Sequence, residues 1–117
     1  MTRFRVWRLA ALLLFGAAAA CSAGAKELPE SLYGTWNGGN REVTSVRFSD
    51  GGRVELNDGQ CGGEYRLSAV DGNKGSVRSG YIRCGRIMDG YFTATVTVDG
   101  DSMTADGSVI NGQYKRA

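Results

Sequence analysis

The sequence has no histidine, one proline and three cysteines in 117 residues. The lack of histidine excludes Ser-His-Asp and Cys-His catalytic arrangements, histidine zinc sites and histidine acid–base chemistry. With twelve acidic residues, the paired carboxylates that glycoside hydrolysis needs are still possible. However, so short a chain has no insertion that would form a substrate cleft. We therefore expect a protein that is not an enzyme and that needs no metal or cofactor.

The basic excess is confined to the start of the chain. The fourteen basic residues outnumber the twelve acidic ones, yet Arg3, Arg5 and Arg8 all lie near the N-terminus. The rest of the chain has eleven basic and twelve acidic residues, a net charge of −1. We expect no nucleic-acid partner, because such partners call for a clustered positive charge.

Residues 1–20 are predicted to be a signal peptide. The three early arginines precede an uninterrupted apolar run of twelve residues, 9–20. A bilayer-spanning helix needs about 20 apolar residues, so this run fits a signal peptide better than a membrane span.

Two cleavage sites compete. Cleavage after Ala23-Gly24-Ala25 would remove residues 1–25 and release a soluble periplasmic protein starting at Lys26. Alternatively, Ala18-Ala19-Ala20 before Cys21 resembles a bacterial lipobox. Cys21 would then be the lipid attachment site of an outer-membrane lipoprotein facing the periplasm. The sequence leaves both options open.

Either processing scheme leaves Cys61 and Cys84 as the remaining cysteine pair. Two cysteines in an exported domain predict one structural disulfide.

The folded domain is expected to span residues 32–117, after a short linker at 21–31. Sixteen of the eighteen glycines fall in this domain, many of them directly after Asp or Asn. Asp-Gly and Asn-Gly pairs favour tight hairpin turns, and glycine this frequent disfavours helices.

Between these turns, apolar and polar residues alternate. In residues 92–98, Phe, Ala, Val and Val alternate with three threonines. This period of two predicts half-buried strands. About eight strands are expected, at 34–38, 43–49, 53–57, 63–70, 75–83, 90–98, 102–106 and 110–116. Such a succession predicts an all-β fold, a small antiparallel up-and-down β-barrel.

Five segments of the domain contain short hairpin and strand motifs in a fixed order: Leu32–Trp36, Val46–Gly51, Gly63–Leu67, Asp99–Thr104 and Gly112–Arg116. Together they resemble small bacterial exported lipocalin-like (calycin-type) domains. The resemblance implies that Trp36 plugs one barrel end, with Tyr114 or Arg116 nearby. It also implies a non-enzymatic protein that binds a small amphipathic molecule or a protein partner.

A fainter resemblance is to periplasmic inhibitors of secreted metalloproteases, which share the early Gly-x-Trp. It gives the alternative function, inhibition of an exogenous hydrolase such as a protease or a lysozyme. A cavity inside the barrel would favour a small ligand, whereas a filled interior would favour a protein partner.

A cationic and aromatic loop around Cys84 is the candidate binding patch. Arginine, tyrosine and methionine are enriched in interface cores. The candidate residues are Arg78, Tyr81, Arg83, Arg86, Met88 and Tyr91. The alternative is that these arginines simply line the solvated face of a strand. The sequence leaves the oligomeric state open.

Overall fold

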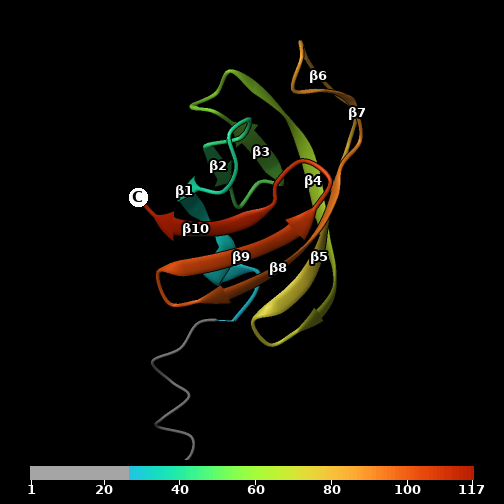
Figure 1. The fold of residues 1–117 in the computed structure, drawn as a ribbon. Helices are drawn as coiled ribbons and strands as arrows, with labels where there is room; N and C mark the ends of the chain where they lie inside the picture. The colour runs from blue at the N-terminus through green and yellow to red at the C-terminus, as the bar shows by residue number, and fades with distance from the viewer. Residues whose placement is uncertain (1–26) are drawn as a thin grey trace, which may run out of the picture.

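The computed structural model describes residues 27–117 (Figure 1). The predicted signal peptide, both cleavage sites and Cys21 lie outside the described residues. Within residues 27–117, no helix has the length and apolar character needed to cross a membrane.

Eight strands form a closed antiparallel barrel, which confirms the predicted fold class. Around the barrel the order is β1-β10-β9-β8-β5-β4-β3-β2, so each barrel strand pairs with the next one along the chain and β1 closes on β10. The barrel strands are β1 (Gly34–Gly38), β2 (Ser45–Phe48), β3 (Arg53–Leu56), β4 (Cys61–Asp71), β5 (Lys74–Ser79), β8 (Thr93–Asp99), β9 (Ser102–Gly107) and β10 (Gly112–Arg116). A 3-10 turn, η1 (Glu30–Leu32), precedes β1.

The predicted alternation places apolar side chains inside the barrel. In β8, Ala94, Val96 and Val98 are buried while the intervening threonines face outward. Burying these side chains is the main stabilising contribution to folding. The largest fully buried side chains are Trp36, Tyr114, Phe48, Phe92, Leu32, Leu56, Ile82, Met103 and Ile110.

The alternation fails near the end of β4. The register between β4 and β5 shifts between Ser68 and Asp71, and Ala69 has a positive φ of 51°. Ala69 and Val70 are consequently exposed, as expected where a bulge interrupts the two-residue repeat.

Two predicted strands, 75–83 and 90–98, end differently in the structure. β5 stops at Ser79 and β8 begins at Thr93. The chain between them forms a separate two-stranded sheet, β6 (Ile82–Cys84) with β7 (Met88–Gly90). Runs of alternating residues cannot by themselves show that a strand leaves one sheet for another.

The packed part of the chain begins earlier than residue 32. Leu28 is buried in the core, and its N–H donates to the carbonyl of Gly72 at 3.1 Å. Part of the expected linker therefore packs against the turn between β4 and β5. We call this the N-terminal end of the barrel, and the end that carries β6 and β7 the tip end (Figure 1).

Candidate functional site

Trp36 lies fully buried at the N-terminal end. Its indole N–H donates to the carbonyl of Leu32 at 2.9 Å. The guanidinium of Arg116 lies over the indole ring, 4.1 Å from its centroid. Arg116 is the register partner of Trp36 across β1 and β10, so strand pairing fixes this contact.

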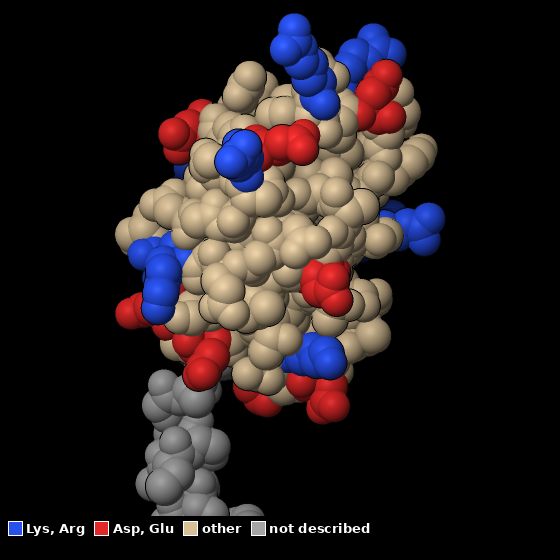
Figure 2. Space-filling view, in the orientation of Figure 1, with Lys and Arg blue, Asp and Glu red and all other residues tan. Residues whose placement is uncertain are grey.

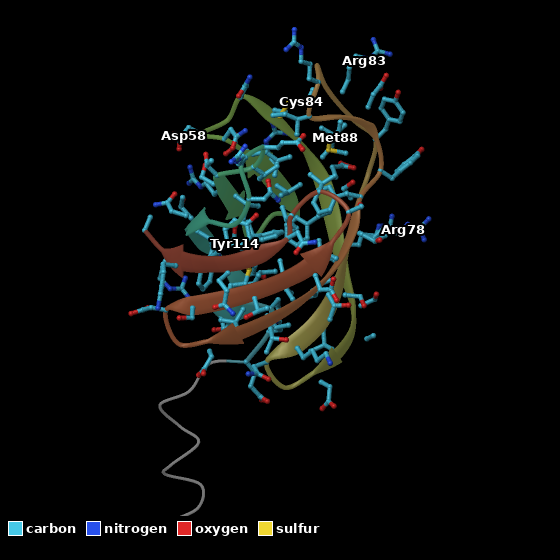
Figure 3. All side chains as sticks on the ribbon, in the orientation of Figure 1. Asp58, Arg78, Arg83, Cys84, Met88 and Tyr114 are labelled. Atoms are coloured by element: carbon cyan, nitrogen blue, oxygen red, sulfur yellow. A yellow bond between two sulfur atoms is a disulfide. The ribbon has the colours of Figure 1, made fainter. Side chains whose placement is uncertain are left out.

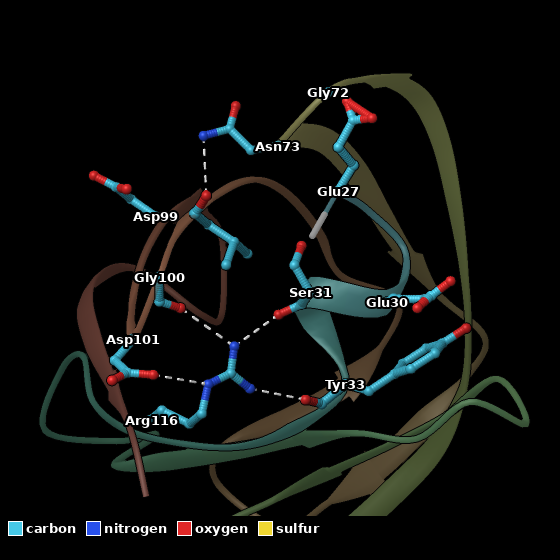
Figure 4. Close-up of a pocket in the computed structure, with 11 residues that line it drawn as sticks. Glu27, Glu30, Ser31, Tyr33, Gly72, Asn73, Asp99, Gly100, Asp101 and Arg116 are labelled. Carbon is cyan, nitrogen blue, oxygen red and sulfur yellow. Dashed lines mark hydrogen bonds and ion pairs between the residues drawn. The ribbon is translucent and has the colours of Figure 1, made fainter. Parts of the chain in front are cut away.

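Arg116 also connects the last strand to two other segments (Figure 4). Its guanidinium donates to the carbonyls of Tyr33 and Ser31 at 2.9 Å each and to that of Gly100 at 3.3 Å. Its Nε lies 3.4 Å from the Asp101 carboxylate. These contacts occupy the donors of Arg116 within the protein itself.

An open hollow of about 1210 Å³ lies around Arg116. Four carboxylates line it, those of Glu27, Glu30, Asp99 and Asp101. Since the one cation in the lining is already engaged, we interpret this end as a structural closure.

Tyr114 is fully buried and pairs with Gly38, two register pairs from the Trp36–Arg116 pair on β1 and β10. Its hydroxyl donates to the carbonyl of Val43 at 3.3 Å. Its ring packs on Gly39, whose φ of +74° and lack of a side chain admit the ring. Burial raises the pKa of Tyr114. Of the two residues expected near Trp36, Arg116 lies over the indole ring, and Tyr114 belongs to the same buried core cluster as Trp36.

The barrel interior is filled by side chains. Trp36, Met103 and Tyr114 have no solvent-exposed surface, and Phe48 and Phe92 are each only 1% exposed. The hollows around Arg116 and beside Tyr91 are open to solvent and lie on the outside. This packing is the arrangement that favours a protein partner over an enclosed small ligand.

The segment 80–92, here called the tip, is fixed to the barrel at its base. The N–H of Phe92 donates to the Ser79 hydroxyl at 2.8 Å, and the N–H of Gly80 donates to the Glu64 carbonyl at 2.8 Å. Ser79 is itself buried. These bonds hold the two chain segments together where they leave the barrel.

The disulfide Cys61–Cys84 ties the tip to the start of β4, as predicted, with the Cα atoms 5.4 Å apart. Ile82 packs directly on Gly63, where a Cβ would lie 2.7 Å from the Ile82 Cγ1. A glycine at position 63 is therefore needed for this close approach. The tip is consequently held by a covalent bond and by an apolar contact.

Two tyrosines are exposed on the tip. Tyr81 is 52% exposed and Tyr91 65% exposed, and their rings meet edge to face with centroids 5.6 Å apart. Within residues 27–117, Val70 is the one other large apolar residue that is exposed. Exposed aromatic rings that touch each other are typical of binding surfaces.

Polar contacts hold the outer side of the tip. The Tyr81 hydroxyl donates to the Asp89 carboxylate, and Arg83 lies 3.9 Å from the same carboxylate. The bond to Asp89 raises the pKa of Tyr81. Arg83 and Arg86 are exposed, and Arg83 points outward at the tip end (Figure 3).

Met88 does not belong to the exposed patch in which it was predicted. Its side chain is only 8% exposed and packs in the core cluster beneath the tip (Figure 3). The β6–β7 pairing sets Met88 opposite Cys84, and both residues face inward. From the six predicted patch residues, five stay exposed: Arg78, Tyr81, Arg83, Arg86 and Tyr91. We call these five the tyrosine–arginine patch.

Arg66 was not predicted as part of a site, although it faces Arg78. The two arginines are direct register partners on β4 and β5, and both are exposed. They line an open hollow of about 370 Å³ together with Tyr91. Sequence alone does not give strand register, so no signal in the sequence connects positions 66 and 78.

Both charge signs are present toward each end of the barrel (Figure 2). Basic side chains project furthest at the tip end, where acidic side chains lie next to them. Within residues 27–117, no group of three acidic or cysteine side chains is arranged to hold a metal ion.

The fold and its exposed patch define this chain as a small closed antiparallel β-barrel with a disulfide-pinned tip. No protein-family model, curated protein sequence or solved structure matches this chain.

Proposed function

We propose that this chain is a non-enzymatic binding protein of the bacterial cell envelope. In this proposal the N-terminal signal directs export, and the tyrosine–arginine patch binds a protein partner. The observation that carries the proposal is the exposed Tyr81–Tyr91 pair on a disulfide-pinned tip, above a barrel interior occupied by large buried side chains.

The position of the patch also supports this function. Glu27, where the described chain begins, lies at the N-terminal end, opposite the tip. An acyl anchor on Cys21 would therefore leave the tip directed away from the membrane. Several acyl chains would make such an anchor firm, because each buried CH₂ contributes about 0.8 kcal/mol.

The patch has the composition of a binding hot spot. Tyrosine and arginine dominate hot spots, because they combine a large contact area with directional hydrogen bonds. A preformed tip also loses little conformational freedom on binding.

The test is site-specific photo-crosslinking in cells that express the full chain. A photoreactive residue replaces Tyr91 in one strain and Val70, the exposed control, in another. We expect a discrete protein adduct from position 91 that position 70 does not give. Arg83→Gln together with Arg86→Gln should abolish this adduct. The proposal would be refuted if positions 91 and 70 gave the same adducts, or if the adduct from position 91 still formed after both arginines were replaced.

Inhibition of an exogenous hydrolase is the second candidate function. It is favoured by the shape of the tip, a convex hairpin that projects beyond the barrel (Figure 1). A rigid convex loop is suited to a concave enzyme cleft. If this function is correct, the purified protein inhibits a secreted protease or a lysozyme at equimolar concentration, and Tyr81→Ala abolishes the inhibition. If Tyr81→Ala inhibits the hydrolase as strongly as the wild type does, the tip is not the surface that contacts the enzyme.

A further inference from the structure

Arg66 and Arg78 form an unusual pair on the outer face of the barrel. They are direct partners in the antiparallel β4–β5 pairing, so their Cβ atoms lie about 5 Å apart on one face of the sheet. Like charges directly opposite each other destabilise a sheet. Within residues 27–117, neither arginine forms an ion pair with a carboxylate.

The surroundings of this pair form a shallow site. The hollow of about 370 Å³ is lined by both arginines and by the exposed ring of Tyr91. One carboxylate, that of Glu64, also lines it. Arg53, the register partner of Glu64 on β3, is paired with Glu55 at 3.8 Å. Two arginines against the single carboxylate of Glu64 still leave the hollow with an excess of positive charge beside an aromatic surface.

A carboxylate-bearing segment would complement this hollow. An anion between two guanidinium groups removes their mutual repulsion and forms charge-assisted hydrogen bonds. Tyr91 adds an apolar surface for the carbon atoms next to the carboxylate. Uncharged ligands would leave the repulsion in place.

We propose that Arg66, Arg78 and Tyr91 form an anion subsite that binds an acidic polypeptide segment of the protein partner. This inference rests on the proposed function, because Arg78 and Tyr91 belong to the tyrosine–arginine patch. It adds Arg66 to the contact surface and assigns the partner a carboxylate-rich contact.

The test uses the purified protein produced from the full chain. The two probes are a hexaglutamate peptide and an uncharged hexaglutamine peptide. Binding is followed by NMR at low ionic strength, where exposed charges are least screened. We expect hexaglutamate to bind and to shift the signals of Arg66, Arg78 and Tyr91. Hexaglutamine should leave these signals unchanged.

Arg66→Gln and Arg78→Gln should each weaken hexaglutamate binding about tenfold, the typical effect of one charged hydrogen bond. The matched control is Arg41→Gln, because Arg41 is exposed in the loop between β1 and β2 and remote from the hollow. This control should bind as tightly as the wild type. An equal loss in Arg41→Gln, or no binding by the wild type, would overturn the inference.

A second measurement separates this role from a structural one. Without peptide, Arg66→Gln should raise the melting temperature by about 1–3 °C, because it removes the cross-strand repulsion. If Arg66 were instead kept for stability, Arg66→Gln would lower the melting temperature, and that result would count against the subsite.

Failure of the subsite and failure of the proposed function give different results. If the photo-crosslink at position 91 forms but hexaglutamate binding ignores both arginines, the function stands and the subsite is wrong. If hexaglutamate binding depends on both arginines but no protein adduct forms, the subsite stands and the proposed partner is wrong.

Discussion

Arginine lies beside an aromatic ring at two places on the barrel, but the two arrangements differ in what the arginine contacts. At the N-terminal end, Arg116 covers Trp36 and donates to three backbone carbonyls. On the outer face of the barrel, at the base of the tip, the exposed Arg78 lies beside the exposed Tyr91. The first pair closes the fold, and the second is free to contact another molecule. The same residue types therefore serve stability or recognition according to their burial and their hydrogen-bond partners.

Trp36→Ala should give the largest effect, because it removes the ring on which the N-terminal closure packs. Truncating a buried tryptophan costs about 3–5 kcal/mol, a large fraction of the stability of a small domain. Denaturant unfolding followed by circular dichroism measures this loss. A variant that melts within a degree or two of the wild type would show that the N-terminal closure does not depend on Trp36.

Breaking the disulfide should affect the tip more than the N-terminal end. Cys61 and Cys84 are 23 residues apart, and closing a loop of this size contributes about 3 kcal/mol in the chain-entropy model. The double variant Cys61→Ser, Cys84→Ser should lose about that much stability. Hydrogen exchange should accelerate first in residues 80–92. Uniform acceleration over the whole barrel would contradict the comparison between the two ends.

Alkaline pH should distinguish two tyrosines. Burial, followed by the nearby Tyr33 and Asp50, raises the pKa of Tyr65 to about 12 from an ordinary value of 10.0. The folded state then holds this proton more tightly than the unfolded state. The corresponding stability is complete below pH 10 and is lost as the pH rises toward 12.

Tyr65→Phe should flatten this loss of stability between pH 10 and 12. It should also cost about 1 kcal/mol at neutral pH, because the hydroxyl donates to the Ser49 carbonyl. Tyr81→Phe is the comparison at the tip. It should change the alkaline stability profile less than Tyr65→Phe, because the Tyr81 side chain is exposed and solvent screens its interaction with Asp89. Urea unfolding at several pH values measures both, and equal profiles for Tyr65→Phe and the wild type would refute the assignment.

The smallest effect on stability is expected from the patch itself. Tyr81→Ala and Tyr91→Ala should each change the free energy of unfolding by no more than about 0.5 kcal/mol, as is usual for exposed residues. Thermal melts check this. A loss comparable to that of Trp36→Ala would mean that the tyrosine pair stabilises the tip and is not kept for recognition.

The barrel was predictable from the sequence because its signals are local. Alternation in residues 92–98 and the Asp-Gly turns reveal strands and hairpins without knowledge of distant contacts. The disulfide was predicted from the two cysteines that remain in the folded domain once the predicted signal peptide and Cys21 are set aside. The role of Arg116 was open, because the motif offered Tyr114 as an equal neighbour of Trp36.

The tip was less predictable, because it depends on contacts between residues distant in sequence. By composition, Met88 belongs to an apolar and basic loop. In the structure it pairs with Cys84 across β6 and β7, and the disulfide from Cys84 to Cys61 holds this side of the hairpin against the barrel, so Met88 is buried. The Arg66–Arg78 pair exists only in one register of β4 and β5. A shift by one residue would separate these side chains onto opposite faces.

The closure of β1 on β10 has a consequence for how the protein is made. The first and last barrel strands, β1 and β10, are register partners, and Arg116 of β10 covers the Trp36 ring of β1. Because synthesis proceeds from the N-terminus, Trp36 can pair with Val46 of β2 early, but Arg116 covers its ring only after β10 has been made. The sheet therefore keeps an open edge at β1 until β10 is available, and closure of the barrel is a late step of folding.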